Sequence, residues 1–212
     1  MKFVPNILKP FLINLCFIGI AFASEPCPSI SPKIAGDTPT EQVRAIINDV
    51  VCSFIELQSA NNGSLTSTLN LTKKKILPYI DLEYSTKLAL SNYWNQLDSR
   101  ERKIFERDIK NSLIDEYIGI LSDLTNWKDI TVSVNDNFTQ NENIAKVEIS
   151  VSLEDENSDA TVILKLIRKN RWRLYDLEYQ SISIIDIEKI GYDSKIKRQG
   201  IEKLIQKMLN KS

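Results

Sequence analysis

The stretch RWRLYDLEYQSISI, residues 171–184, decides the class of fold, because here the sequence has the period of a β-strand rather than of a helix. Alternation gives this strand one face of large apolar side chains: Tyr175, Leu177 and Tyr179. Asp176 and Glu178 fall on the other face, which lies at solvent or at an edge if the apolar face turns inward. We therefore interpret the stretch as a wall of an apolar interior and not as a catalytic strand.

Working outward, the chain divides into helical segments, then strands, then a closing helix. Period-two alternation predicts three more strands, at residues 130–134, 147–153 and 162–167, joined by polar turns such as 135–137 and 155–158. Helical spacing predicts helices at residues 40–57, 67–75, 82–94, 98–124 and 186–209. The order predicts an α+β fold, with N-terminal helices and a C-terminal helix packed on a roughly four-stranded antiparallel sheet.

The first 23 residues have the pattern of a secretory signal peptide. Lys2 and Lys9 precede the apolar run 11–20, and small residues end the segment at Ala23, after which we expect cleavage. The run is too short to anchor the chain across a bilayer. The expected product is an exported protein.

The exported chain is expected to comprise a flexible leader, residues 24–39, and a single α+β domain, residues 40–212. Cleavage removes two lysines and leaves 25 basic against 28 acidic residues, so the charge does not indicate a nucleic-acid partner. Cys27 and Cys52 remain as an even pair, which favours a disulfide in an exported protein. The alternative is a buried thiol at Cys52 and an unpaired Cys27.

The sequence lacks the residues of most catalytic sites. It contains no histidine, and its six glycines form no phosphate-binding loop. Asp176 and Glu178 could form a glycosidase-like pair, but their expected outward position argues against it. We expect neither an enzyme nor a metal or cofactor site.

Several segments together resemble the MlaC family, also called the toluene-tolerance auxiliary family, of periplasmic phospholipid-binding proteins. The segments that carry the resemblance are ILPYIDL at 76–82, LSNYW at 90–94, RERKIF at 100–105 with EYIGIL at 116–121, WRLYDLEYQSISII at 172–185 and GIEKLI at 200–205. Ser91 and Ser181 stand where the family usually has glycine, and residues 187–189, IEK, stand where it usually has NYR. The resemblance extends over residues 40–209.

The resemblance implies a curved antiparallel sheet and helices that enclose an apolar pocket for phospholipid tails. It also implies a soluble periplasmic carrier of an ABC-type intermembrane lipid transport system. Its implied partners are phospholipid, an inner-membrane ABC transporter with a lipid-binding ring, and an outer-membrane lipoprotein and porin complex. Such a carrier needs a pocket because exposing two sixteen-carbon chains to water costs roughly 25 kcal/mol of free energy.

The candidate lipid-contacting residues combine this implication with the apolar patterns. Those on the helical part are Tyr79, Leu88, Ile109 and Leu113; those on the strands are Val147, Ile149, Val151, Leu164, Leu166, Tyr175, Leu177 and Tyr179. The competing interpretation is that most of them form an ordinary core. Two other classes of protein stay open: a secreted protein-interaction module with a fully packed interior, and a hydrolase or isomerase on a similar scaffold.

Overall fold

The computed structural model describes residues 37–60, 64–123, 127–153 and 160–210. The α-helices are α1 (Pro39–Ser59), α2 (Leu65–Lys75), α3 (Leu82–Leu90), α4 (Ser99–Asp123), α5 (Ile184–Gln199) and α6 (Ile201–Leu209). Short 3-10 helices are η1 (Leu77–Tyr79), η2 (Ser91–Gln96) and η3 (Trp127–Asp129). The strands are β1 (Ile130–Asn141), β2 (Ile144–Leu153), β3 (Ala160–Arg168), β4 (Trp172–Tyr179) and β5 (Ile182–Ser183).

The strands form one antiparallel sheet whose spatial order follows the chain, β1-β2-β3-β4-β5. This confirms the predicted α+β class. The predicted strand at residues 172–184 is wrong in one respect, because a tight turn divides it. Gln180 and Ser181 both have positive φ angles, 49° and 63°, as a two-residue hairpin turn requires. The turn brings Ile182 back alongside Tyr179, and the sheet gains a short fifth strand.

The hairpin between β1 and β2 also differs from the prediction. The chain turns at Glu142, which has a φ of 50°, and not at residues 135–137. Those polar residues lie inside β1, where the register with β2 shifts between Val134 and Phe138. Such a bulge accommodates residues that have no place in a regular ladder. The predicted turn at residues 155–158 lies outside the described residues.

Two predicted helices are shorter than their apolar patterns. The predicted helix at 82–94 ends at Leu90, because Ser91 takes a positive φ of 49° and the chain continues as the 3-10 helix η2. The predicted helix at 186–209 is broken at Gly200, whose φ of 82° favours glycine and separates α5 from α6.

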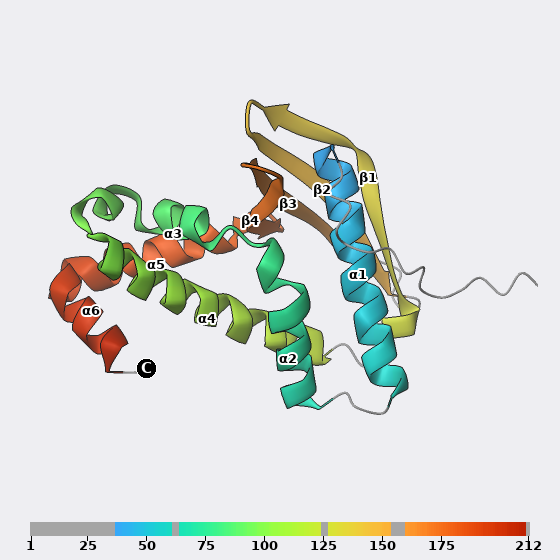
Figure 1. The fold of residues 1–212 in the computed structure, drawn as a ribbon, viewed down its shortest axis with the longest axis horizontal. Coiled ribbons are helices and arrows are strands. Elements are labelled where there is room, and N and C mark those ends of the chain that lie inside the picture. Colours follow the sequence, from blue (N-terminus) through green and yellow to red (C-terminus); the bar gives the residue numbers. More distant parts are fainter. Residues whose placement is uncertain (1–36, 61–63, 124–126, 154–159, 211–212) are drawn as a thin grey trace, which may run out of the picture.

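Helix α1 lies across one face of the sheet and follows β1 (Figure 1). It begins at a capping box, in which the Thr38 hydroxyl accepts from the Glu41 amide and the Glu41 carboxylate accepts from the Thr38 amide. Its sheet-facing side carries apolar residues at helical spacing: Val43, Ile46, Val50 and Phe54. The spacing of these residues determines which side of α1 faces the sheet.

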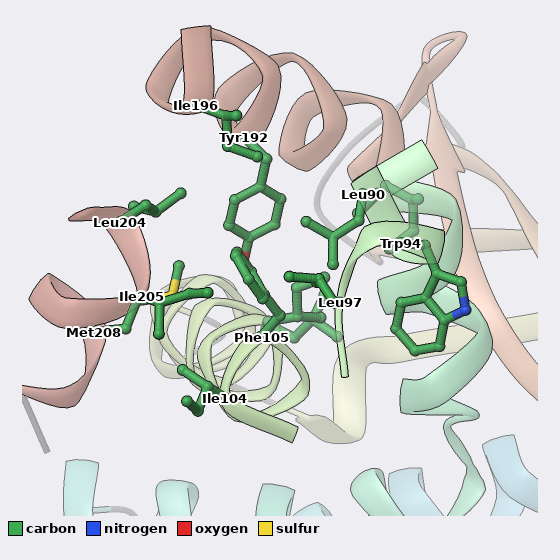
Figure 2. Packing of buried hydrophobic residues seen from close by; sticks show 14 of the residues in the cluster. Leu90, Trp94, Leu97, Ile104, Phe105, Tyr192, Ile196, Leu204, Ile205 and Met208 are labelled. Carbon is green, nitrogen blue, oxygen red and sulfur yellow. The ribbon is translucent and has the colours of Figure 1, made fainter. Parts of the chain in front are cut away.

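Helices α3 to α6 pack beside the sheet around a core of their own (Figure 1). At its centre the ring of Tyr192 from α5 meets Phe105 from α4 edge to face, with centroids 5.4 Å apart (Figure 2). Leu90 and Ile205 close around the pair. The Tyr192 hydroxyl donates to the carboxylate of Asp108 at 2.9 Å. We call this cluster the helical core.

The outer edge of β4 is covered near both of its ends. The Asp81 amide donates to the Leu174 carbonyl at 2.6 Å, and the Arg173 guanidinium donates to the Ile80 carbonyl at 2.6 Å. β5 pairs with the last two residues of the strand. These contacts satisfy an edge that would otherwise present unpaired backbone groups.

Candidate functional site

One face of the sheet is apolar across its strands, and α1 packs on this face. We call it the interior face. Residues that lie directly opposite one another in neighbouring strands point to the same side of a sheet. On this basis, an outer row crosses all five strands: Val134, Ile149, Val162, Tyr179 and Ile182. A middle row beside it crosses four strands: Phe138, Val147, Leu164 and Leu177.

The interior face is fully buried at its centre and half-buried around it. Val147 is 0% exposed and Ile149 is 5% exposed, whereas Val162 and Leu177 are half-buried. Two apolar clusters meet here, one around Val43 and one around Phe54 of α1. They share half-buried side chains: Val132, Val151 and Leu174. The two clusters therefore form one continuous apolar set between α1 and the sheet, buried at its centre and only partly covered around it.

The structure brings most of the predicted strand residues together on the interior face. These are Val147, Ile149, Val151, Leu164, Leu166, Leu177 and Tyr179. Of these, Leu166 belongs to the cluster around Val43, and Tyr179 is 43% exposed at the far end of the outer row. Their side chains point to the same face because alternate residues of a β-strand point to the same side.

Tyr175 does not lie on the interior face, contrary to the predicted alternation. The register of β3 with β4 shifts so that Leu166 lies opposite Leu174 and Lys165 lies opposite Asp176. Tyr175 is the extra residue of this bulge. Its ring packs edge to face on Tyr84 of α3, with centroids 5.0 Å apart, and burial raises its pKa. A bulge changes which side chains share a face, and sequence alternation cannot reveal it.

The predicted helical residues fall into different parts of the molecule. Tyr79 joins the cluster around Phe54, next to α1 and the sheet. Ile109 and Leu113 lie in the helical core instead, at 0% and 4% exposure. Leu88 packs at the margin of that core and, with Tyr175, lines a cavity of about 170 Å³ between α3, α5 and β4. Only Tyr79 of the four is near the interior face.

The opposite face of the sheet carries an ionic network at β3 and β4. The Lys165 ammonium lies 2.9 Å from Asp176 Oδ2 and 3.0 Å from Glu178 Oε2. Burial by itself would lower the pKa of Lys165, but the hydrogen bonds that its ammonium donates to these two carboxylates outweigh burial, and the pKa is raised. Asp176 also accepts from the Ser183 hydroxyl at 2.7 Å and from the Ile185 amide at 3.2 Å. The network fixes the start of α5 against β4.

This network gives Asp176 and Glu178 a structural role. Both carboxylates lie on one face, as the alternation predicts, and both bind the same ammonium group. The expected position at solvent or at an edge is wrong for Asp176, whose side chain is 4% exposed, because α5 begins against this face. A sequence signal for it was present, because Lys165 is the one charge inside the apolar strand VILKLI, residues 162–167. A lysine whose side chain is mostly covered, here 13% exposed, requires carboxylate partners, and the strand that follows supplies two.

A second polar group borders the cluster around Phe54. Asp49 of α1 accepts from the Lys75 ammonium at 2.7 Å. Burial, together with the charge of Asp49, raises the pKa of the nearby Tyr79. The pair closes one flank of α1 against the end of α2.

Among the described residues, no three Cys, Asp or Glu side chains gather where they could hold a metal ion. None of the helices in the described ranges is long and apolar enough to cross a membrane. Cys52 of α1 is part of a disulfide. Cys27 lies outside the described residues, so its pairing with Cys52 stays a prediction.

The fold and the interior face define a class of α+β protein in which a helix and an antiparallel sheet hold a partly covered apolar surface between them. The sequence model of the MlaC protein family matches residues 44–210. The chain therefore belongs to the MlaC family.

Two relatives illustrate the likeness. The chain is 24% identical to the intermembrane phospholipid transport system binding protein MlaC of Haemophilus influenzae, over 95% of this chain and 92% of that protein. A phospholipid-binding protein from Ralstonia solanacearum, solved in complex with a phospholipid, superimposes with a TM-score of 0.68 at 21% identity. The superposition covers 81% of this chain and 94% of that chain, and it shows a shared fold.

Proposed function

We propose that this protein is a periplasmic phospholipid carrier that holds acyl chains against the interior face, between α1 and the sheet. The observation that carries the proposal is the partly covered apolar surface beside α1, where Val162, Leu174 and Leu177 are half-buried. The names of the two relatives support it, since one is an intermembrane phospholipid transport protein and the other was solved with a phospholipid.

The physical basis is the free energy of covering hydrocarbon. Each methylene removed from water contributes about 0.8 kcal/mol, so an acyl chain is held by apolar contact without specific polar groups. A binding surface of this kind needs large apolar side chains that are not already saturated by neighbours. The half-buried residues of the interior face meet this requirement, whereas the fully buried side chains at the centre of the helical core do not.

In this function residues 1–23 direct export and are removed, and the domain at residues 40–212 carries lipid between membranes. The proposed partners are an inner-membrane ABC transporter with a lipid-binding ring and an outer-membrane lipoprotein and porin complex. The chain acts by binding and release and catalyses no reaction, which accords with the absence of histidine from the sequence.

The experiment fills the space with a side chain from the protein itself. Ile149 lies at the buried centre of the outer row, so Ile149→Trp puts a large ring between α1 and the sheet. The matched control is Ser150→Trp, because Ser150 is the next residue of β2 and faces the other side. Lipid content is measured by solvent extraction after incubation with vesicles of phosphatidylethanolamine and phosphatidylglycerol.

We expect Ile149→Trp to lose most of its lipid and Ser150→Trp to keep it. Overpacking costs about 1 to 3 kcal/mol, so both variants are first checked for cooperative thermal unfolding. Equal lipid content in a folded Ile149→Trp and in the wild type would place the acyl chains elsewhere and refute the proposal.

A further inference from the structure

The outer row leads from the buried interior to the surface of the molecule, and its only polar side-chain atom is the hydroxyl oxygen of Tyr179. Its exposed fraction rises along the row, from 5% at Ile149 to 43% at Tyr179 and 57% at Ile182, with Val162 half-buried between them. The row therefore forms an apolar path that ends at β5.

The fold itself does not require apolar side chains at this end. β5 pairs with β4 through backbone groups, and the buried residue of β5 is Ser183, which points to the opposite face of the sheet, is 4% exposed and binds Asp176. A solvent-facing position beside a hairpin turn is ordinarily polar. Two large adjacent apolar side chains at such a place indicate contact with something apolar.

The Tyr179 ring is suited to a boundary between apolar and aqueous surroundings. Its hydroxyl accepts a hydrogen bond from the Gln180 side-chain amide at 3.1 Å, at the turn, while its ring continues the apolar row. Tyrosine commonly takes such positions, because one end of the side chain is apolar and the other binds water or a polar group.

α1 leaves this end of the interior face open. Val43, near its start, shares a cluster with Leu166 and Trp172, whereas Phe54, near its end, stacks on Trp127 just before β1. The helix thus approaches β1, which is the sheet edge opposite to β5 (Figure 1). Its most extensive contacts with the sheet are with β1 and β2.

We propose that Tyr179 and Ile182 form a portal through which the acyl chains of a phospholipid enter and leave the space between α1 and the sheet. The proposal rests on the function proposed above and adds the route that the ligand takes. The occupant is the acyl chain and not a protein segment, because the portal is continuous with the apolar lining and adds no charge to it.

The portal acts on the rate of exchange and not on the affinity. An acyl chain that slides over Tyr179 and Ile182 stays in apolar contact while it leaves the bilayer, and each methylene kept from water is worth about fourfold in the equilibrium between the two surroundings. A polar group at the portal removes this contact in the transition state for transfer. The resting complex, deeper on the interior face, is unaffected.

The test compares the rates of phospholipid transfer in two variants, each with one exposed isoleucine replaced. Ile182→Gln changes the portal, and the matched control Ile187→Gln changes an α5 residue that is 52% exposed and lies outside the row. Vesicles of phosphatidylethanolamine and phosphatidylglycerol carry a pyrene-labelled phospholipid, and loss of its excimer signal reports uptake. Release is followed by mixing loaded protein with unlabelled vesicles.

We expect Ile182→Gln to slow uptake and release about fivefold, as loss of contact with one or two methylenes implies, with the lipid content at equilibrium unchanged. Ile187→Gln is expected to transfer lipid at the wild-type rate. Unchanged rates in Ile182→Gln, or equal slowing in both variants, would overturn the portal. A wild-type protein that takes up no lipid at all would instead overturn the proposed function, and the portal with it.

A second variant removes any effect of the substitution on folding. Ile182→Cys is folded first and then modified with a negatively charged methanethiosulfonate, with Ile187→Cys treated in the same way as the control. The charge is expected to slow transfer in the modified Ile182→Cys protein only. Slowing confined to the modified Ile187→Cys protein would assign the contact to the outer side of α5.

Discussion

The helical core and the interior face are both apolar, but they differ in how completely their side chains are covered. In the helical core Phe105, Ile109 and Leu90 are 0% exposed, and Tyr192 is 1% exposed. On the interior face only the centre reaches this degree of burial, and the outer row opens to 57% exposure at Ile182.

The difference separates a region that stabilises the fold from a region that can bind. A side chain whose contacts are all made inside the protein contributes its full transfer free energy to folding. A half-buried apolar side chain keeps contact area that a ligand can still use. The two regions should therefore respond in opposite ways to substitution, one in stability and the other in lipid binding.

The largest effect is expected for Phe105→Ala in the helical core. Removal of the ring leaves a cavity beneath Tyr192 and should lower the free energy of unfolding by about 3 to 5 kcal/mol. The matched control is Phe138→Ala, because Phe138 is 37% exposed on the interior face and should cost less than about 1 kcal/mol. Urea unfolding measures both, and equal losses would abolish the distinction between the regions.

The next effect is expected from the ionic network on the opposite face. Lys165→Met leaves Asp176 buried and facing Glu178 without a cation, which should cost about 2 to 3 kcal/mol. Lys146→Met is the control, because Lys146 lies opposite Lys165 on β2 but is exposed, and its loss should stay within about 0.5 kcal/mol. A stable Lys165→Met protein would show that the network does not fix α5.

The helical core and the interior face also show how much of the structure could be predicted from the sequence. Period-two and helical spacing located the strands and helices, because each pattern reports which side of one element is buried. The same reasoning placed Val147, Ile149 and Leu164 on one face, since each lies in a regular part of its strand.

The rest depended on interactions between elements. The bulge that turns Tyr175 toward α3 arises from the shifted register of two strands, and no local pattern encodes it. Ile109 and Leu113 have the same apolar helical spacing that a lipid-facing helix would have, so their membership of the helical core is decided by packing alone. Sequence spacing predicts that a side chain is buried but not which neighbour buries it.

A smaller effect, dependent on pH, is expected at Tyr192. Burial, with the charge of Asp108, raises its pKa above the ordinary value of 10.0. The folded chain keeps the Tyr192 proton above pH 10.0, whereas the unfolded chain loses it. The contribution of Tyr192 to the free energy of unfolding is therefore fully present below this pH and falls above it. The loss approaches about 1.4 kcal/mol per pH unit.

Tyr192→Phe isolates this contribution. The variant loses the hydrogen bond to Asp108, at a cost of about 1 kcal/mol near neutral pH, and should then lose less stability than the wild type in alkaline solution. Urea unfolding at several pH values either side of 10.0 compares the two proteins. Parallel curves for the two would contradict the raised pKa.

The smallest effect on stability, with a large effect on lipid, is expected for Leu177→Asn. Leu177 is half-buried in the middle row, so the substitution should cost only about 1 kcal/mol in the lipid-free protein. A polar amide on the interior face should lower the lipid content strongly. Leu113→Asn in the helical core should instead lower the stability strongly and leave the lipid content of the folded protein unchanged. Unfolding curves measure the first quantity and lipid extraction the second.

The most direct measurement is native mass spectrometry of residues 24–212, purified from a periplasm without detergent. The predicted result is a protein that carries a stoichiometric added mass, which solvent extraction identifies as phospholipid. A protein of bare chain mass that also takes up no lipid from vesicles would contradict lipid binding on the interior face. It would favour a fully packed protein-interaction module instead.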